Sequence, residues 1–236
     1  FLLPFLRPKK LNFGPWMIIY LLSYCGLCVG IVLALRQTSA AIAVGMQYAS
    51  VIWLFIVSVI MTKKVEKSRV LPVVLITLGV VLFMLTGLEG SSMTGNLIAF
   101  TESICFAFMT VGVKKCAGDN VLGLTALANL FTGFFVFAFL PPQFTDVLAF
   151  NGQEWLIMII LGTVQVGLGY AFYNMGVART TPQKASIIAL WEMILGPTWV
   201  ALFLHEYPSL LVLAGFIIII LGIFLDAKAD NKIETT

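Results

Sequence analysis

Two carboxyl groups interrupt stretches of the chain that are otherwise apolar. Glu192 lies within IIALWEMILGPTW (187–199), and Glu102 lies within TESICFAF (101–108). If these stretches cross a membrane, each charge near mid-bilayer costs at least ~2.5 kcal/mol, so each side chain is expected to face the bundle interior or water. Two interpretations stay open for both residues. Each carboxyl either exchanges a proton or recognises a cation, or it holds helices together through hydrogen bonds.

The surroundings of Glu192 favour a solvated pathway but do not decide it. Trp199 lies seven residues further on and shares the helical face of Glu192. Pro197 removes the amide donor that would bond the carbonyl of Met193, so it bends the helix. The freed carbonyl could line a water-filled pathway, or the kink could serve packing alone.

Amide side chains supply a second set of candidate pathway residues. In the apolar stretch 154–177, Asn174 lies beside Tyr170 on the helix, whereas Gln165 lies about half a turn away. The two amides are therefore not expected to face the same side, and the sequence does not choose between them. Gln165 lies near a stripe of glycines that predicts a packing surface for another helix, at positions 162, 169 and 176.

Further polar residues predict contacts between helices. Thr125, Asn129 and Thr132 share one face of the stretch 121–140, where such groups more often hydrogen-bond to a neighbouring helix than bind a solute. Tyr20 and Tyr24 share a face of the stretch 13–35, or Tyr20 lies in the core between helices.

The elements that must position these groups are membrane spans. The chain has 236 residues, of which 60% are hydrophobic and 11% charged, whereas soluble domains carry about 25% charged residues. Apolar runs that are long enough to cross a bilayer of ~30 Å predict eight full spans, at residues 13–35, 39–62, 70–88, 93–113, 121–140, 154–177, 183–204 and 209–226.

The distribution of basic residues predicts the orientation of these spans. Thirteen of the fourteen Lys and Arg residues fall on one side of the predicted bundle, and only Arg36 falls on the other. Because cytoplasmic loops carry the excess of basic residues, that side and the C-terminus are predicted to be cytoplasmic. We therefore expect a multi-pass protein of the cell (inner) membrane.

An internal repeat relates the two parts of the chain. ALRQTSAAIAVGMQYASVIW (34–53) matches VARTTPQKASIIALWEMILGPTW (177–199) in the order of its features, and LITLGVVLF (75–83) matches IIILGIFL (218–225). If Gly79 is aligned with Gly222 and the second copy has a shorter extracellular turn, Gln47, which is followed by Tyr48, falls opposite Glu192. Matching spans are five apart, so the copies, residues 1–90 and 91–236, are predicted to have inverted topology, as in many secondary transporters. The first copy would lack its first helix and most of its second, which we expect from the opening FLLPFLRPKK.

On these residues the chain resembles the EamA-type transporters of the drug/metabolite transporter superfamily. The resemblance is carried by the Arg-Thr-Thr-Pro turn at 179–182, the Ala-Ser-Ile-Ile run at 185–188, Glu192, the pair His205-Glu206 and the glycine-containing last helix. It implies an all-α membrane fold of ten helices in a 5+5 inverted repeat, with both termini cytoplasmic and a central site for a small organic solute. The chain departs from the family pattern in having Met193, and not proline, after Glu192.

The function predicted from the sequence is secondary transport. We expect export of a small organic metabolite, such as an amino acid, a nucleobase or a drug-like solute, by alternating access. The sequence contains neither a phosphate-binding G-x-x-x-x-G-K-[ST] motif nor HExxH, and we expect no cofactor, metal or nucleic-acid partner. Protons are a candidate coupling ion, and the protein is expected to be a monomer or homodimer in the lipid bilayer. Two alternatives remain: a non-transporting membrane scaffold, and a membrane enzyme using Glu102 and Glu192.

Overall fold

The regular elements of the described chain are all helices. The computed structural model describes residues 11–86, 92–139, 149–180, 192, 194–196, 198–199, 202–203, 205 and 207–234. Within these residues, seven helices are long and apolar enough to cross a membrane. They match seven of the eight predicted spans, and the eighth, 183–204, lies largely outside the described residues. This is the composition expected of a polytopic membrane protein.

The helices belong to two compact units. Unit 1 comprises residues 1–25 and 108–180, and unit 2 comprises residues 26–107 and 181–236. Two long helices, α1 (Pro15–Leu35) and α5 (Met93–Cys116), each contribute residues to both units. The units therefore do not coincide with the two predicted repeats, because each contains segments of both repeats.

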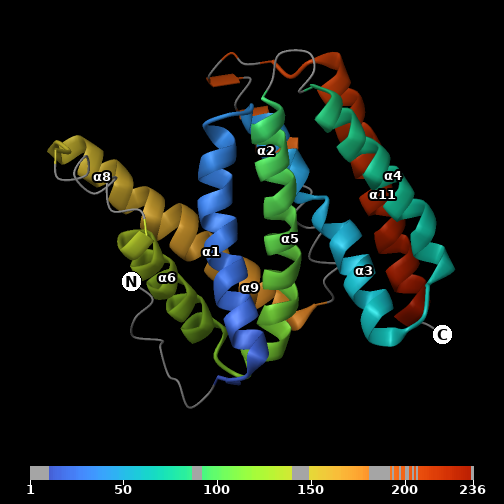
Figure 1. Ribbon diagram of the computed structural model, residues 1–236, viewed down its shortest axis with the longest axis horizontal. Coiled ribbons are helices and arrows are strands. Elements are labelled where there is room, and N and C mark those ends of the chain that lie inside the picture. Colours follow the sequence, from blue (N-terminus) through green and yellow to red (C-terminus); the bar gives the residue numbers. More distant parts are fainter. Residues whose placement is uncertain are drawn as a thin grey trace. The chain divides into compact units, whose positions relative to one another are not determined.

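The close packing of unit 2 centres on α4 (Lys67–Leu85) and α11 (Leu210–Glu234), which lie side by side (Figure 1). Glycines permit this approach. A Cβ atom on Gly222 would lie 2.6 Å from Cγ1 of Ile76, and one on Gly79 would meet Ile219. Along α4 from Ile76 to Phe83, the contacted glycine in α11 changes from Gly222 to Gly215. The two helices therefore run antiparallel.

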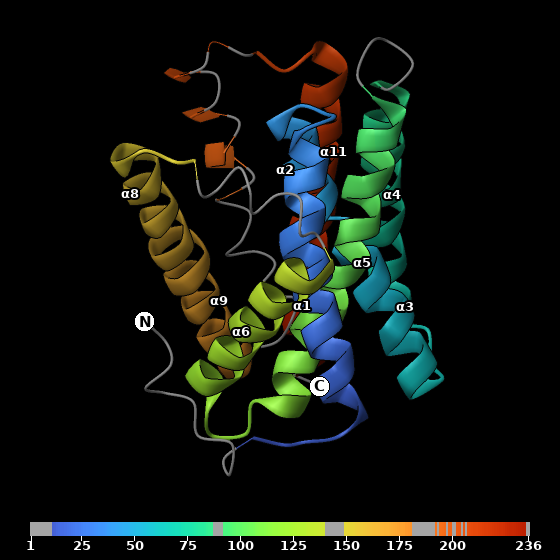
Figure 2. The ribbon, with the colours of Figure 1, turned by 60° about the vertical axis from the view of Figure 1, so that its left-hand side comes forward.

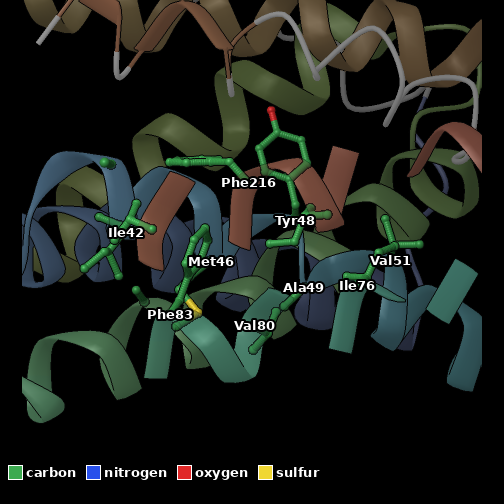
Figure 3. Packing of buried hydrophobic residues seen from close by; sticks show 14 of the residues in the cluster. Ile42, Met46, Tyr48, Ala49, Val51, Ile76, Val80, Phe83 and Phe216 are labelled. Carbon is green, nitrogen blue, oxygen red and sulfur yellow. The ribbon is translucent and has the colours of Figure 1, made fainter. Parts of the chain in front are cut away.

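An apolar cluster extends from this pair to α2 (Ala40–Gln47) and α3 (Ser50–Thr62). Phe83 and Phe216 pack edge to face, with ring centroids 5.1 Å apart. Tyr48 is 4% exposed within the cluster, and its hydroxyl group points away from the other labelled side chains (Figure 3). The cluster thus fixes the backbone at the junction of α2 and α3.

The predicted span 39–62 is interrupted at that junction. Ser39 caps the start of α2, where its side chain accepts a hydrogen bond from the amide of Ile42. Around Tyr48 and Ala49, four amides bond carbonyls three residues back, in the manner of a 3₁₀ turn: Tyr48 to Gly45, Ala49 to Met46, Val51 to Tyr48 and Ile52 to Ala49. This interruption occurs without a proline.

In unit 1, one long run of helix packs against α6 (Val121–Phe139). The run consists of α8 (Gly152–Ile160), the π-helix η4 (Leu161–Leu168) and α9 (Gly169–Arg179). It meets α6 mainly through α9 and to a lesser extent through η4 (Figure 2). Asn151 and Glu154 form a capping box at the start of α8. The glycines at 162, 169 and 176 have no described atom within 4 Å of an added Cβ. No described residue therefore packs against these three glycines, and the helix-packing stripe stays a prediction.

Candidate functional site

A buried carboxyl–amide pair lies in unit 2. Glu102 on α5 is 2% exposed, and its Oε1 accepts a hydrogen bond of 2.6 Å from Nε2 of Gln47 at the end of α2. The other carboxyl oxygen, Oε2, is buried and has no hydrogen-bond partner within the described chain. The sequence predicted both residues as pathway residues, but it did not predict that they bind each other.

A glycine on α1 makes room for this carboxyl group. A Cβ atom at Gly30 would lie 3.2 Å from Cγ of Glu102 and 3.4 Å from its Cβ. Such distances are tighter than ordinary van der Waals contact, so a larger residue at position 30 would displace the Glu102 side chain. Glu102 is thus positioned by three helices, namely α1, α2 and α5.

Polar contacts on either side of the pair hold α5 in register. Towards the start of α5, Asn96 accepts a hydrogen bond of 2.6 Å from Thr38 and donates one of 3.0 Å to the carbonyl of Phe83. Beyond Glu102, Ser103 accepts a hydrogen bond of 3.0 Å from Nε1 of Trp53. Sequence reasoning missed Asn96, Ser103 and Gly30. For Asn96 and Ser103, the available signal was a polar side chain within the predicted apolar span 93–113.

The second predicted carboxyl group is placed differently. Glu192 is exposed. Trp199 is 52% exposed and stacks on Phe203, with ring centroids 5.6 Å apart. Pro197, the predicted kink, lies outside the described residues. Of the two carboxyl groups, Glu102 is therefore the one enclosed by helices.

A second polar cluster lies in unit 1 and joins α1, α6 and α9. Asn174 is fully buried, and its amide nitrogen donates to the hydroxyl groups of Thr125 (2.9 Å) and Tyr20 (3.2 Å). Tyr24 donates to Oδ1 of Asn129 over 3.2 Å. The ring of Tyr170 meets that of Tyr24 edge to face, with centroids 5.0 Å apart. These groups are neutral and link helices, as the sequence predicted for Thr125 and Asn129.

Gln165 does not join this cluster. It is exposed on the π-helix η4, whereas Asn174 is buried. The two amides therefore lie on different sides, as expected from their spacing. The predicted pathway residues thus fall into two groups: Glu102, Gln47, Tyr48, Glu192 and Trp199 in unit 2, and Asn174, Tyr170 and Gln165 in unit 1.

Comparison with known proteins identifies the family. The profile of the EamA-like transporter family matches residues 93–226, which is more than half of the chain. The chain belongs to the EamA-like transporter family. This family is part of the drug/metabolite transporter superfamily and consists of membrane transporters, not enzymes. No curated protein sequence matches the chain significantly.

The residues that match the family include one member of the carboxyl–amide pair and not the other. Glu102 lies inside the matched residues 93–226, whereas Gln47 and Gly30 precede them. Membership of the EamA-like transporter family therefore indicates that the chain is a membrane transporter. It does not identify the substrate.

Proposed function

We propose that this EamA-like protein carries a small organic solute across the membrane by alternating access, with Glu102 and Gln47 at the polar centre of its pathway. The observation that carries the proposal is a carboxyl group that is 2% exposed and has one oxygen without a partner in the described chain. Buried polar groups in proteins are normally hydrogen-bonded. An unmet carboxyl oxygen therefore supports a binding role over a purely structural one.

The depth of Glu102 in the membrane supports this role. It is the tenth residue of α5, so at 1.5 Å per residue it lies about 14 Å along the helix, well inside a hydrocarbon core of ~30 Å. A carboxylate at that depth costs at least ~2.5 kcal/mol even on lenient insertion scales, and such residues typically mark solute or ion pathways.

The contacts between α4 and α11 support the proposed inverted repeat. With Gly79 aligned to Gly222, Ile76 aligns with Ile219, and Pro72 aligns with Gly215. A Cβ on Gly79 would meet Ile219 and the carbonyl of Gly215, whereas one on Gly222 would meet Ile76 and the carbonyl of Pro72. Each contact that a residue of α4 makes with α11 thus has a counterpart between the two aligned residues, with the roles of the helices swapped. A pseudo-two-fold axis between the helices requires this.

Irregular helix turns provide places where the spans could bend during transport. The tightened turn at Tyr48–Ala49 directly follows Gln47, and the π-helix Leu161–Leu168 lies within the longest span. Short 3₁₀ and π segments within helices often mark functional hinges, and interrupted helices form the substrate sites of many secondary transporters.

Solute flux through liposomes that contain the full chain tests the proposal. We expect saturable counterflow of at least one member of a panel of amino acids, nucleobases, amines and drug-like solutes. Glu102→Gln should reduce the flux at least tenfold. Thr101→Val is the matched control, because Thr101 is exposed beside Glu102 and, among the described residues, its hydroxyl donates to the carbonyl of Leu97 on its own helix. Absence of saturable flux for every solute would contradict transport and favour a scaffold.

Export, with the C-terminus in the cytoplasm, completes the proposed function. Accessibility of a cysteine placed at Lys228 to a membrane-impermeant thiol reagent, in intact cells and in inverted vesicles, tests the orientation. Labelling only in inverted vesicles is expected, and labelling in intact cells would contradict it.

A further inference from the structure

On the basis of the proposed function, we infer that the transported solute carries a primary ammonium group and that this group binds Oε2 of Glu102. The two oxygens of this carboxyl group have different surroundings. Oε1 has the amide donor of Gln47 at 2.6 Å, whereas Oε2 is buried and has no donor within the described chain.

The charge of the carboxyl group has no partner in the described part of unit 2. The Lys and Arg residues whose side chains the structure describes there lie in turns or within two turns of a helix end: Arg36, Lys63, Lys64, Lys67, Arg69 and Lys228. The described ion pair of this unit joins Arg69 to Glu66 at the start of α4. A cation that pairs with Glu102 in its ionised form therefore comes from outside these residues, and a solute can supply it.

The surroundings of Glu102 favour a cationic solute over an anionic or neutral one. An ionised Glu102 repels an anion from this region. Hydrogen bonds to a carboxylate are strongest when the donor is ionised, and they are then roughly twice as strong as neutral ones. An ammonium group meets both requirements.

The geometry also distinguishes a primary ammonium from a quaternary one. The unmet group is a hydrogen-bond acceptor, and a quaternary ammonium has no N–H to donate, whereas a primary ammonium has three. A primary ammonium can therefore donate to Oε2, and a quaternary one cannot.

Three probes with the same apolar body and different heads test the inference. They are phenethylamine, phenethyl alcohol and phenethyltrimethylammonium. We expect phenethylamine to slow carbodiimide modification of Glu102 in the purified full chain at least fivefold, as followed by peptide mapping. The alcohol and the quaternary ion should have little effect. Equal protection by the alcohol, or none by the amine, would overturn the inference.

A second measurement covers the case in which Glu102 does not react with the carbodiimide. The shift of the thermal unfolding midpoint with phenethylamine gives an apparent affinity, which should fall at least tenfold in Glu102→Gln and stay unchanged in Thr101→Val. Unchanged affinity in Glu102→Gln would overturn the inference. A carboxyl group that only braces helices predicts that result.

The two proposals fail in different ways. If the amine protects Glu102 but no solute crosses the liposome membrane, the proposed transport is wrong and the ammonium site remains. If neutral or anionic solutes show saturable flux and the amine does not bind, the transport function remains and the assigned substrate class is wrong.

Discussion

Two sets of helix glycines, one in each unit, have opposite surroundings. In unit 2, a Cβ on Gly222 would lie 2.6 Å from Ile76, and one on Gly215 would lie 2.6 Å from Phe83. In unit 1, the regularly spaced glycines at 162, 169 and 176 meet no described atom within 4 Å. Small residues allow helices to approach closely in membranes. Their spacing alone does not show that a partner helix is present.

The polar contacts of the two units differ in the same way. Unit 1 links its helices through neutral amide and hydroxyl groups, with Asn174 at the centre. Unit 2 already has close glycine packing, and its central polar residue is the ionisable Glu102. We therefore expect polar substitutions in unit 1 to act mainly on stability and those at Glu102 mainly on transport.

The largest expected change in stability follows from Gly79→Ala. The added methyl group would lie 2.9 Å from the carbonyl oxygen of Gly215, and a backbone atom cannot easily move away. Overpacking of this kind costs about 1–3 kcal/mol, more than the ~0.5–1 kcal/mol that alanine contributes in a helix. Unfolding of the purified protein in detergent measures the loss. Gly222→Ala should behave alike, and a large difference between the two variants would contradict the equivalence of α4 and α11.

Asn174→Ala should have the next largest effect. The substitution removes two hydrogen bonds between helices, which together correspond to about 1–2 kcal/mol of unfolding free energy. Gln165→Ala is the matched control on the same long helix, because Gln165 is exposed, and it should change stability by less than ~0.5 kcal/mol. If both variants were equally stable, the polar cluster of unit 1 would not be what links its helices.

Tyr24→Phe should have a smaller effect of the same sign. It deletes the hydroxyl group that donates to Asn129 while keeping the ring against Tyr170. Single hydrogen bonds between membrane helices average ~0.6 kcal/mol. Tyr207→Phe, at a tyrosine that is 77% exposed, serves as the control. A loss above that for Asn174→Ala would place the centre of the cluster at Tyr24 instead.

The smallest effect is expected from the triple variant Gly162→Ala, Gly169→Ala and Gly176→Ala. Added methyl groups meet no described atom, so the unfolding midpoint should stay constant or rise slightly. Light scattering of the same sample reports the oligomeric state. Conversion of a dimer to a monomer would show that the stripe packs against a second copy, as the sequence pattern predicts for some partner helix.

The spans could be predicted because they depend on local composition. Seven apolar runs became helices close to their predicted bounds, since length and hydropathy decide whether a segment can cross a bilayer. The shared faces of Tyr20 with Tyr24 and of Thr125 with Asn129 followed from helical periodicity.

The pairing of Gln47 with Glu102 could not be predicted in that way, because it depends on which helices are neighbours and at what depth. From the sequence, Glu192 and Glu102 had the same two interpretations, but of the two only Glu102 is buried, whereas Glu192 is exposed. The interruption at Tyr48–Ala49 was also missed. The interruption contains no proline that would have marked it in the sequence. It lies within the apolar cluster of unit 2, where it packs against other helices.

The turn at Tyr48–Ala49 has a rotational consequence for the whole span. In a regular α-helix, Gln47 and Trp53 would point about 120° apart, yet both side chains bond to α5, at Glu102 and Ser103. A 3₁₀ turn rotates each residue about 20° further around the helix axis than an α-helix does. The four hydrogen bonds to carbonyls three residues back therefore bring Trp53 most of the way back to the side of the helix on which Gln47 lies. Any change that restored regular α-helix here would swing the whole of α3 about its axis and turn Trp53 away from α5.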